Sequence, residues 1–581
     1  MMKFLNLVKQ FLWESQYKKI VKKQKRNFFA NWDNPKYFDK KWNLDYKNID
    51  IKDRSVQNNV KTIGSNVVYQ VLVYNFADGN NDGIGDFIGL KNKIPYFVNL
   101  KVDQLWLSPI HPSTSYHGYS VIDFCDVAEQ LGGMNAFLDF LDEAHKNGIK
   151  VYLDMVFNHT SYEHPWFQKA LLGDKKYENF YRFTEDFYDE DIKTDTNTHR
   201  KRYPNLNQNI FGTNKKFLGR FWAGMPDLNL DNPEVIDQLI AIQKFWVSLG
   251  VDGFRYDAYA EYFSSEIETK NNFNESKIFA LLRKESEKIN PNIFMFGEWL
   301  EDGIKALEYS KFNDEKALDT SYDGMHWKEK IDVRISYENL LNLVNKYSQN
   351  SSDWMPFLSN HDVMRWLDNY RQKFLKIKEN KLLKKKPSAS EIDALKIAIF
   401  VLLAMPARPI LYYGDELGYF GTRTYGDPAL REPMIWNNKN EICQIQETKI
   451  DSLKSKVLAT SALTLPCVEE NISKKDSVYE LIKFLNELRI KYPFLSLTDS
   501  TTIDDPKEYV DCEDYSSVII RKHKNTILMF VYKNDFSENH IVRKISRKYN
   551  FKLIYSYKCI NRTWGIEMNK NSMAIFELKR K

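Results

Sequence analysis

From residue 66 onward, short apolar runs alternate with amphipathic helical patterns, and this alternation constrains the fold more than any other feature of the chain. Strands that alternate with helices indicate βαβ units and a parallel sheet. Helical patterns occupy 134–147, 233–249, 275–289 and 393–404. The apolar runs lie at 67–73, 102–107, 149–157, 251–256, 293–297, 355–358 and 409–413, and a weaker eighth run lies near Ala317–Ser321.

Eight such units form a (β/α)8 TIM barrel, which typically takes ~250 residues and more with insertions. The chain of 581 residues is long enough for a barrel with attachments. We therefore predict an α/β protein whose barrel is built from residues 63–157 and 227–490.

Two further domains are expected around the barrel. After the third run, residues 158–226 are polar, aromatic and irregular, and a structureless loop of that length would be unusual. We interpret 158–226 as an inserted domain. From about residue 495 alternating strand patterns take over, so 491–581 is predicted to be an antiparallel β-sandwich. The basic segment 371–386 is interpreted as a solvated surface helix, with a polyanion site as the alternative.

Residues 1–62 form a basic N-terminal extension. Within 1–30 there are eight Lys or Arg residues and one acid, and Phe4, Leu7, Val8, Phe11 and Leu12 share one helical face. Such a helix can dock on its own protein or lie on an anionic membrane surface. Because Lys9 and Gln10 interrupt the apolar run and no cleavage site follows, we expect no signal peptide and a cytoplasmic protein, with membrane-surface association as the alternative.

Charge and cysteine content restrict the partners. The chain has 83 Lys or Arg and 78 Asp or Glu, which gives a net charge of +5. This near balance favours a neutral substrate and makes nucleic acid an unexpected binding partner. Its five cysteines contain no C-x-x-C pair, so neither a zinc site nor a disulfide framework is indicated. No organic cofactor is expected.

Ionisable and polar residues collect where the runs end, and in a barrel those ends meet at one mouth. Three carboxylates come from three different strands: Asp257, Glu298 and Asp362. Other polar ends are Asp154, Asn158, His159, Arg255, Asn360 and His361.

Three explanations fit this acidic cluster. One is an ion-pair network with Arg255, and another is a metal cluster. The third is glycoside chemistry, in which one carboxylate attacks the anomeric carbon and a protonated one donates to the leaving oxygen. Arg255 lies two residues before Asp257, and strand alternation places both on the same face, where Arg255 could keep Asp257 ionised.

The segment DGNNDGIGD at 78–86 is a candidate metal loop. It places oxygen ligands at Asp78, Asn80, Asp82 and Asp86, and the Ile84 carbonyl could add one. Hard oxygen donors at this spacing suit Ca²⁺. The alternative is an Asx-rich turn without metal.

Short motifs in a fixed order resemble the α-amylase family (glycoside hydrolase family 13) over about residues 64–490. Similar segments are LDMVFNH (153–159), MPDLNL (225–230), GVDGFRYDA (250–258), FGEW (296–299) and SNHD (359–362). HGYSVIDF (117–124), YYGDELG (412–418) and REPMIW (431–436) also resemble family segments.

The resemblance implies a retaining mechanism. In it, Asp257 is the nucleophile, Glu298 the general acid/base and Asp362 the transition-state stabiliser. The implied substrate-binding residues are Arg255, His361, His159, Tyr119, His117 and Asp154. Many relatives also bind calcium at the loop that contains Asp78, Asn80, Asp82, Ile84 and Asp86.

We expect cleavage of α-1,4-glucosidic bonds in malto-oligosaccharides or starch-like α-glucans. A small residue after the nucleophile, here Ala258, resembles the α-1,4 type, and Val there resembles the α-1,6 type. One departure is Ala260-Glu261, where many α-amylases carry Lys-His. The alternatives are a glucosyl transferase or isomerase of trehalose synthase or sucrose-cleaving type, an α-1,6-glucosidase, and a non-catalytic glycan-binding protein.

Overall fold

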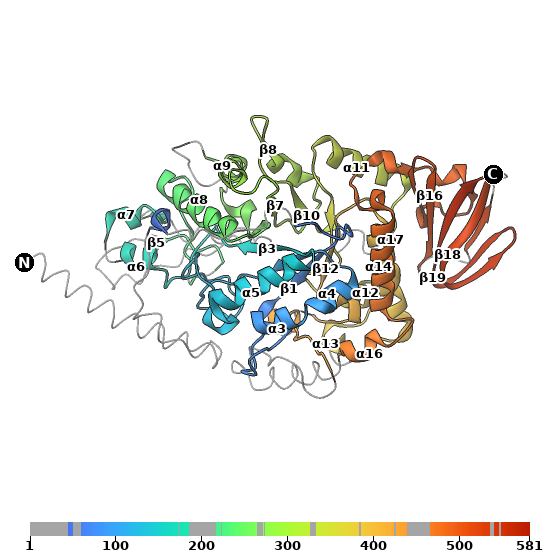
Figure 1. Cartoon of the computed structure of the whole chain (residues 1–581), viewed down its shortest axis with the longest axis horizontal. Coiled ribbons are helices and arrows are strands. Elements are labelled where there is room, and N and C mark those ends of the chain that lie inside the picture. Colours follow the sequence, from blue (N-terminus) through green and yellow to red (C-terminus); the bar gives the residue numbers. More distant parts are fainter. Residues whose placement is uncertain are drawn as a thin grey trace, which may run out of the picture.

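The computed structural model describes most of the chain, apart from its first residues and several internal segments. The described residues are 45–49, 60–171, 173–184, 216–221, 224–263, 271, 273–325, 333–382, 385–422, 426–437, 465–534, 540–544 and 548–581. A large α/β body occupies most of the molecule, and an antiparallel sheet lies at the end farthest from helices α6 and α7 (Figure 1).

The α/β body is built around eight parallel strands in the order β11-β10-β7-β6-β3-β2-β1-β12. A parallel bridge between Phe357 and Ile410 connects the two ends of this order, which closes the barrel. The predicted barrel is confirmed, and the weak run near Ala317–Ser321 corresponds to β10. The strands are β1 Val68–Val71, β2 Gln104–Leu107, β3 Lys150–Met155, β6 Gly253–Tyr256, β7 Phe294–Gly297, β10 Thr320–Asp323, β11 Met355–Pro356 and β12 Ile410–Tyr412.

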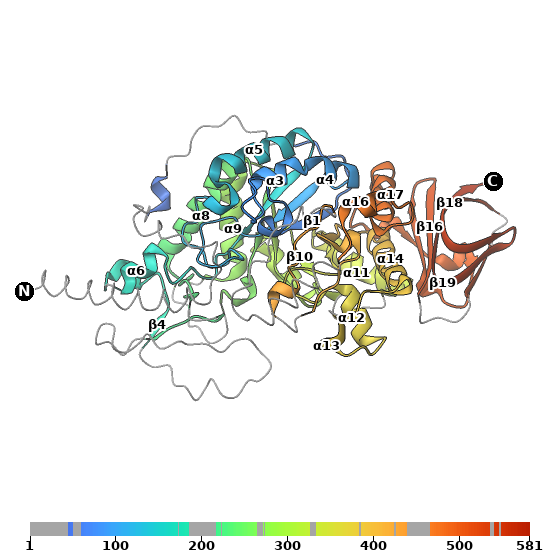
Figure 2. The same cartoon turned by 90° about the horizontal axis from the view of Figure 1, so that it is seen from below.

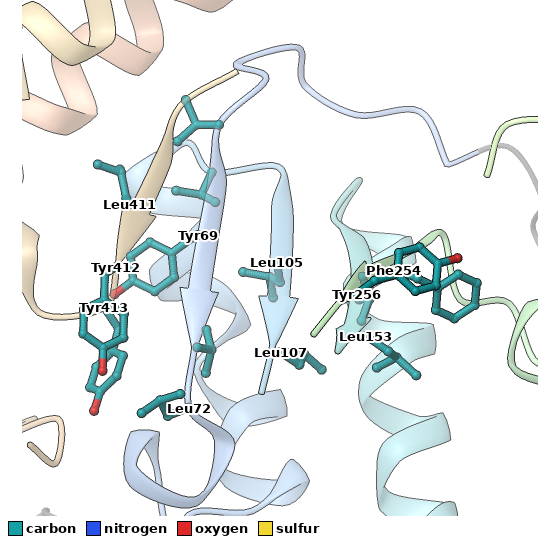
Figure 3. Packing of buried hydrophobic residues seen from close by; sticks show 14 of the residues in the cluster. Tyr69, Leu72, Leu105, Leu107, Leu153, Phe254, Tyr256, Leu411, Tyr412 and Tyr413 are labelled. Atoms are coloured by element: carbon teal, nitrogen blue, oxygen red, sulfur yellow. The ribbon is translucent and has the colours of Figure 1, made fainter. Parts of the chain in front are cut away.

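Side-chain alternation divides the strand residues between two layers. Outward residues such as Leu105, Leu153 and Phe254 pack against the surrounding helices (Figure 3). Inward residues such as Trp106, Tyr152 and Phe296 form a separate buried cluster inside the barrel. The strands are therefore apolar on both faces, as the continuous apolar runs predicted.

Helices cover the outside of the barrel, and capping residues mark where they begin. Asn232 caps α8, whose first residue is Pro233, and Ser388 and Glu391 form a capping box at the start of α14. The helices of the barrel body are α2 Val73–Phe76, α3 Phe87–Asn92, α4 Ile94–Leu100, α5 Gly133–Lys146, α8 Pro233–Ser248, α9 Glu275–Glu287, α11 Tyr337–Gln349, α12 Trp366–Lys373, α13 Glu379–Leu382, α14 Ala389–Ala404, α16 Val468–Ile472 and α17 Val478–Lys491.

The prediction of one surface helix over 371–386 is wrong. Helix α12 ends at Lys373, and the four residues of α13 begin only at Glu379. Arg371 is fully buried and binds Asp368 at 2.7 Å and Glu391 at 3.3 Å. Because its charge is taken up inside the protein, this part of the segment belongs to the core.

Between β3 and α8 the described part of the chain forms a small separate unit. It contains α6 Pro165–Leu171, α7 Lys175–Glu178 and the strand pair β4 Phe183–Thr184 with β5 Lys216–Phe217. Seen from below, α6 and β4 lie beyond the end of α8 (Figure 2). A short turn of the N-terminal extension, η3 Tyr46–Asn48, docks between this unit and α8. The Tyr46 ring centre lies 5.4 Å from that of Trp166 in α6, and the Tyr46 amide donates to Gln238 of α8 at 2.7 Å. The predicted helix around Phe4–Leu12 lies outside the described residues.

The C-terminal strands form one seven-stranded sheet, and all of its pairings are antiparallel. The predicted antiparallel β domain is confirmed, and the long strand β19, which pairs with β16, β17 and β18, joins its strands into one sheet. The strands are β13 Ile503–Asp504, β14 Val510–Asp511, β15 Val518–His523, β16 Thr526–Lys533, β17 His540–Lys544, β18 Tyr549–Arg562 and β19 Gly565–Arg580. Within the part of the chain that the structure describes, every helix is too short or too polar to cross a membrane.

Candidate active site

The inward alternation of the barrel strands carries the predicted polar residues to the mouth. In β3, Asp154 follows Tyr152 on the inner face, and in β6 Arg255 follows Gly253. Glu298 comes two residues after the inward Phe296 of β7. Because alternate residues of a strand face the same side of the sheet, these side chains all point into the barrel and meet at its mouth.

Arg255 is the centre of the site. Its guanidinium is fully buried and lies 2.7 Å from Asp154 Oδ1, 2.7 Å from Asp257 Oδ1 and 2.9 Å from Glu298 Oε2. Its Nη2 also donates to the Tyr322 hydroxyl at 3.1 Å, and its cationic carbon lies 5.2 Å from the centre of the Trp106 ring. Three carboxylates from three strands thus share one cation.

Asp362 enters from the loop after β11. The Asn360 side chain accepts a hydrogen bond from the Asp362 amide at 2.8 Å, which shapes this turn. The Asp362 carboxylate lies 3.1 Å from His361 Nε2 and 3.0 Å from Arg431 Nη2. His361 Nε2 also lies 2.5 Å from the Tyr119 hydroxyl, which lies 3.0 Å from Asp154, so hydrogen bonds connect Asp362 to the carboxylates around Arg255.

Arg431 is a site residue that sequence reasoning missed. Its Nε donates to the His361 carbonyl at 3.0 Å and its Nη1 to the Tyr116 hydroxyl at 3.1 Å. It therefore connects Asp362 and His361 to Tyr116, in the segment that carries His117 and Tyr119. The REPMIW segment that begins at Arg431 was a usable signal, although nothing in its spacing relates it to Asp362.

Tyr119 and His361 form a stacked pair beside the carboxylates. Their ring centres are 5.5 Å apart and their planes differ by 7°. The Tyr119 hydroxyl lies 3.0 Å from Asp154 Oδ2 and 2.5 Å from His361 Nε2. The Gln70 amide donates to His361 Nδ1 at 2.8 Å, so Nε2 carries the ring proton and faces the site.

His159 and His117 line the same mouth. His159 Nε2 donates to the Tyr119 carbonyl at 3.0 Å, and the Tyr119 amide donates to His117 Nδ1 at 3.2 Å. Burial lowers the pKa of His159 to about 4 and lowers that of His117 well below its usual value. Both rings are therefore neutral at pH 7, which suits hydrogen bonds to uncharged hydroxyl groups.

Burial dominates the titration of the acids. It raises the pKa of Glu298 to about 8 and that of Asp257 to about 7, in each case against the lowering effect of Arg255. Two buried anions beside one guanidinium repel each other, so burial favours a single proton bound by the pair. The site then holds one neutral and one ionised carboxyl group, which is the arrangement that acid and nucleophile require.

The backbone after Asp257 is strained and serves Glu298. Ala258 has a φ of 47°, in the left-handed region that a residue with a side chain rarely adopts. In this conformation its amide donates to Glu298 Oε2 at 2.8 Å. A backbone donor fixes the carboxyl group of Glu298, and strain of this kind clusters at functional sites.

The candidate calcium loop connects α2 to α3. Most of its oxygens accept main-chain amides: Asp78 accepts those of Asn81 and Gly83, and Asp82 accepts that of Ile84. Asp86 caps α3 through the Gly89 amide at 2.6 Å, while its Oδ2 is buried without a hydrogen-bond partner among the described residues. No group of three or more His, Cys, Asp or Glu side chains is arranged to hold a metal within the described ranges. The loop therefore has the form of an Asx-rich turn in which one buried carboxylate oxygen, Oδ2 of Asp86, has no hydrogen-bond partner among the described residues.

Comparisons with known proteins agree with this architecture. The family model for the α-amylase catalytic domain matches residues 70–497. The chain is 29% identical over 500 residues to alpha-amylase 3 of Dictyoglomus thermophilum, covering 82% of this chain and 88% of that protein. It is 33% identical over 376 residues to the 4-alpha-glucanotransferase of Thermotoga maritima, covering 64% of this chain and 76% of that protein. The structure of Eubacterium rectale Amy13B superposes with a TM-score of 0.71 at 23% identity, covering 90% of this chain and 98% of that one.

Proposed function

The chain belongs to the α-amylase family of glycoside hydrolases, and from its site we propose that it is a retaining enzyme that cleaves α-1,4-glucosidic bonds in malto-oligosaccharides. One observation carries the proposal: Asp257 and Glu298 are held by the two terminal nitrogens of the same guanidinium. Carboxyl groups held by one fork are close together, and retaining enzymes need a separation of only ~5–5.5 Å.

In the first step, Asp257 attacks the anomeric carbon of the bound glucose. Its Oδ1 accepts the hydrogen bond from Arg255, so we assign the attack to Oδ2. The bond from the anomeric carbon to the glycosidic oxygen breaks, and the neutral Glu298 donates its proton to that oxygen. The products are a covalent glucosyl ester on Asp257 and a free leaving sugar.

In the second step, the ionised Glu298 takes a proton from a water molecule, which attacks the anomeric carbon and breaks the ester. Asp257 and the protonated Glu298 are restored, so the cycle balances. Asp362, held by His361 and Arg431, places negative charge beside the positive charge that develops on the ring. Tyr119 supplies a stacking face, and His117, His159 and Asp154 complete the walls of the same subsite.

The bond specificity rests on Ala258, which follows the nucleophile and has a small side chain. Transfer to a sugar in place of water is the second candidate activity, because the glucosyl ester is common to both and a relative that is 33% identical is a 4-alpha-glucanotransferase. The departure at Ala260-Glu261 also supports it, since the lysine that many α-amylases carry at this point is replaced.

The loop at 78–86 fits a structural calcium ion in its donor chemistry. Asp78, Asn80, Asp82, Asp86 and the Ile84 carbonyl are hard oxygen donors, and the spare Oδ2 of Asp86 is the observation that favours a cation. When bound, the ion would neutralise the loop's carboxylates. The loop lies at the start of α3, so we assign it to stability and route no catalytic step through it.

A product profile tests the function. Purified protein is incubated with maltose, maltotriose, isomaltose, sucrose, trehalose and starch, and the products are separated by chromatography. We expect glucose and maltose from maltotriose, released with retained anomeric configuration. Larger oligosaccharides or trehalose would indicate transfer, release from isomaltose would indicate α-1,6 cleavage, and no product from any sugar would contradict the proposal.

A further inference from the structure

Phe221 is an exposed aromatic residue at the rim of the candidate site. About 38% of its surface is exposed, and its ring centre lies 5.2 Å from that of His159. His159 is itself only 1% exposed and lines the mouth. Phe221 therefore continues the wall of the mouth outward, where it can contact a sugar that the inner residues do not reach.

Arg220, the residue before Phe221 in the chain, is anchored by two carboxylates. Arg220 Nε lies 3.1 Å from Asp227 Oδ2, and its Nη1 lies 2.6 Å from Glu261 Oε2. Asp227 pairs through its backbone with His159, so one side of this anchor belongs to the strand end that carries His159. The other side, Glu261, belongs to the turn that follows the candidate nucleophile.

The turn with Glu261 lies on the side of the proton donor. It begins directly after Ala258, whose amide holds Glu298. The stack of Tyr119 and His361 and the pair of Asp362 with Arg431 form another part of the mouth. Because the proton is delivered to the leaving oxygen, the leaving sugar departs on the side of Glu298.

We propose that Phe221 is a stacking platform for the glucose unit on the leaving side of the cleaved bond, and that the Arg220–Glu261 pair holds it there. The apolar face of a pyranose ring suits an aromatic surface with one side buried and one side open. The same position receives the acceptor sugar when the glucosyl ester is transferred, so Phe221 would also influence the choice between sugar and water. This inference rests on the proposed function.

Two substrates separate this role from a general effect on the site. Maltotriose places a sugar on the leaving side, whereas α-maltosyl fluoride has only a fluoride ion there. We expect Phe221→Ala to lower kcat/KM on maltotriose about 10-fold more than on maltosyl fluoride, the loss typical of one apolar contact. With maltosyl fluoride and added maltose, we also expect the ratio of transfer to hydrolysis to fall in Phe221→Ala.

Matched variants control for folding. Phe221→Tyr keeps the ring and should restore the wild-type ratio between the two substrates. Trp564→Ala removes another exposed aromatic, 42% exposed in the turn between β18 and β19, and should leave both substrates unaffected. An equal loss on both substrates in Phe221→Ala would mean that Phe221 acts through His159, and no loss on either would mean that it contacts no sugar; both results overturn the inference. A wild-type protein that cleaves neither substrate would instead contradict the proposed function itself.

Discussion

Two fully buried arginines of this protein do different work. The terminal nitrogens of Arg255 at the mouth serve Asp154, Asp257 and Glu298. Those of Arg489 in α17 serve main-chain carbonyls, at 2.9 Å for Leu403 and 2.6 Å for Ala407. Side-chain type and burial are the same, so the partners alone distinguish a site that handles charge from one that holds the chain together.

The carbonyl partners of Arg489 explain its structural role. The last carbonyls of a helix have no partner within the helix, and α14 ends at Ala404. Arg489 donates a hydrogen bond to the Leu403 carbonyl, and Arg521 of β15 donates one to the Ala404 carbonyl at 3.0 Å. Arg521 thus connects the C-terminal sheet to the end of α14, and Arg489 connects α17 to the same helix end within the barrel body.

Arg255 and Arg489 also differ in how their surroundings shift their pKa values. Burial lowers the pKa of Arg489 to about 9. Burial alone would also lower the pKa of Arg255, but the charge of Asp154 and Glu298 raises it well above the ordinary value. Repelling carboxylates are thus tolerated around Arg255 because the chemistry uses them, and we expect activity and stability to respond in opposite ways at the two places.

The largest expected effect is at the carboxylates of Arg255. Asp257→Asn removes the nucleophile and should lower kcat by about 10⁴-fold or more, and Glu298→Gln should lower it by about 10²–10⁴-fold. Neither change should lower the free energy of unfolding, because burial disfavours an ionised carboxyl group at both positions and the amide places an uncharged group of similar shape there. Steady-state kinetics and urea unfolding measure the two quantities. Retained activity in Asp257→Asn would remove its assignment as nucleophile.

The reverse pattern is expected at Arg489. Arg489→Met leaves several buried carbonyls without a donor and should lower the free energy of unfolding by about 3 kcal/mol, since each unsatisfied group costs ~1–3 kcal/mol. The kcat per folded molecule should stay at the wild-type value. Arg489→Lys keeps one charge but lacks the planar fork, so it should lie between the two. A urea midpoint of Arg489→Met equal to that of the wild type would contradict the structural role assigned to Arg489.

The fold and the acidic cluster were accessible from the sequence because both follow from the period of a strand. The apolar runs locate the eight strands, and the same alternation carries Asp154, Arg255, Asp257 and Glu298 inward. Asp362 follows its strand through a short turn, so it too could be assigned to the mouth.

Contacts that depend on loops or on backbone partners could not be predicted. Arg431 reaches Asp362 from a loop 69 residues away, and no periodicity relates the two. Carbonyl partners such as those of Arg489 have no side-chain signature at all. For the same reason the basic segment at 371–386 was misread, because its burial depends on Arg371 finding Asp368 and Glu391.

Stability against pH gives a finer measure of the Arg255 cluster. The pKa of Glu298 is raised to about 8 in the folded state, so between about pH 4.5 and 8 the folded protein binds more protons here than the unfolded chain. The stability contributed by this group is complete below pH 4.5 and is lost as the pH rises through 8. In Glu298→Gln the unfolding free energy should therefore decrease less steeply with pH, by about 1 kcal/mol per pH unit. Urea unfolding from pH 5 to 8 measures this slope. Parallel curves for the two proteins would show that Glu298 is ionised throughout.

The smallest expected effect concerns the loop at 78–86. Its carboxylates accept hydrogen bonds from main-chain amides, whereas Arg489 donates hydrogen bonds to main-chain carbonyls. Asp82 accepts the Ile84 amide at 2.8 Å and Asp78 the Gly83 amide at 2.7 Å, so the loop is closed by hydrogen bonds without a cation. A calcium ion would add to this closure by binding only the folded loop, which raises stability by mass action. Calcium should therefore raise the Tm of the wild-type protein by a few degrees (roughly 1 kcal/mol), and Asp82→Ala should abolish this increment while its Tm in chelator stays near that of the wild type. Identical wild-type melting curves with calcium and with chelator would assign the loop to hydrogen bonding alone, and would place it with Arg489 among the parts of the molecule that are held by backbone partners.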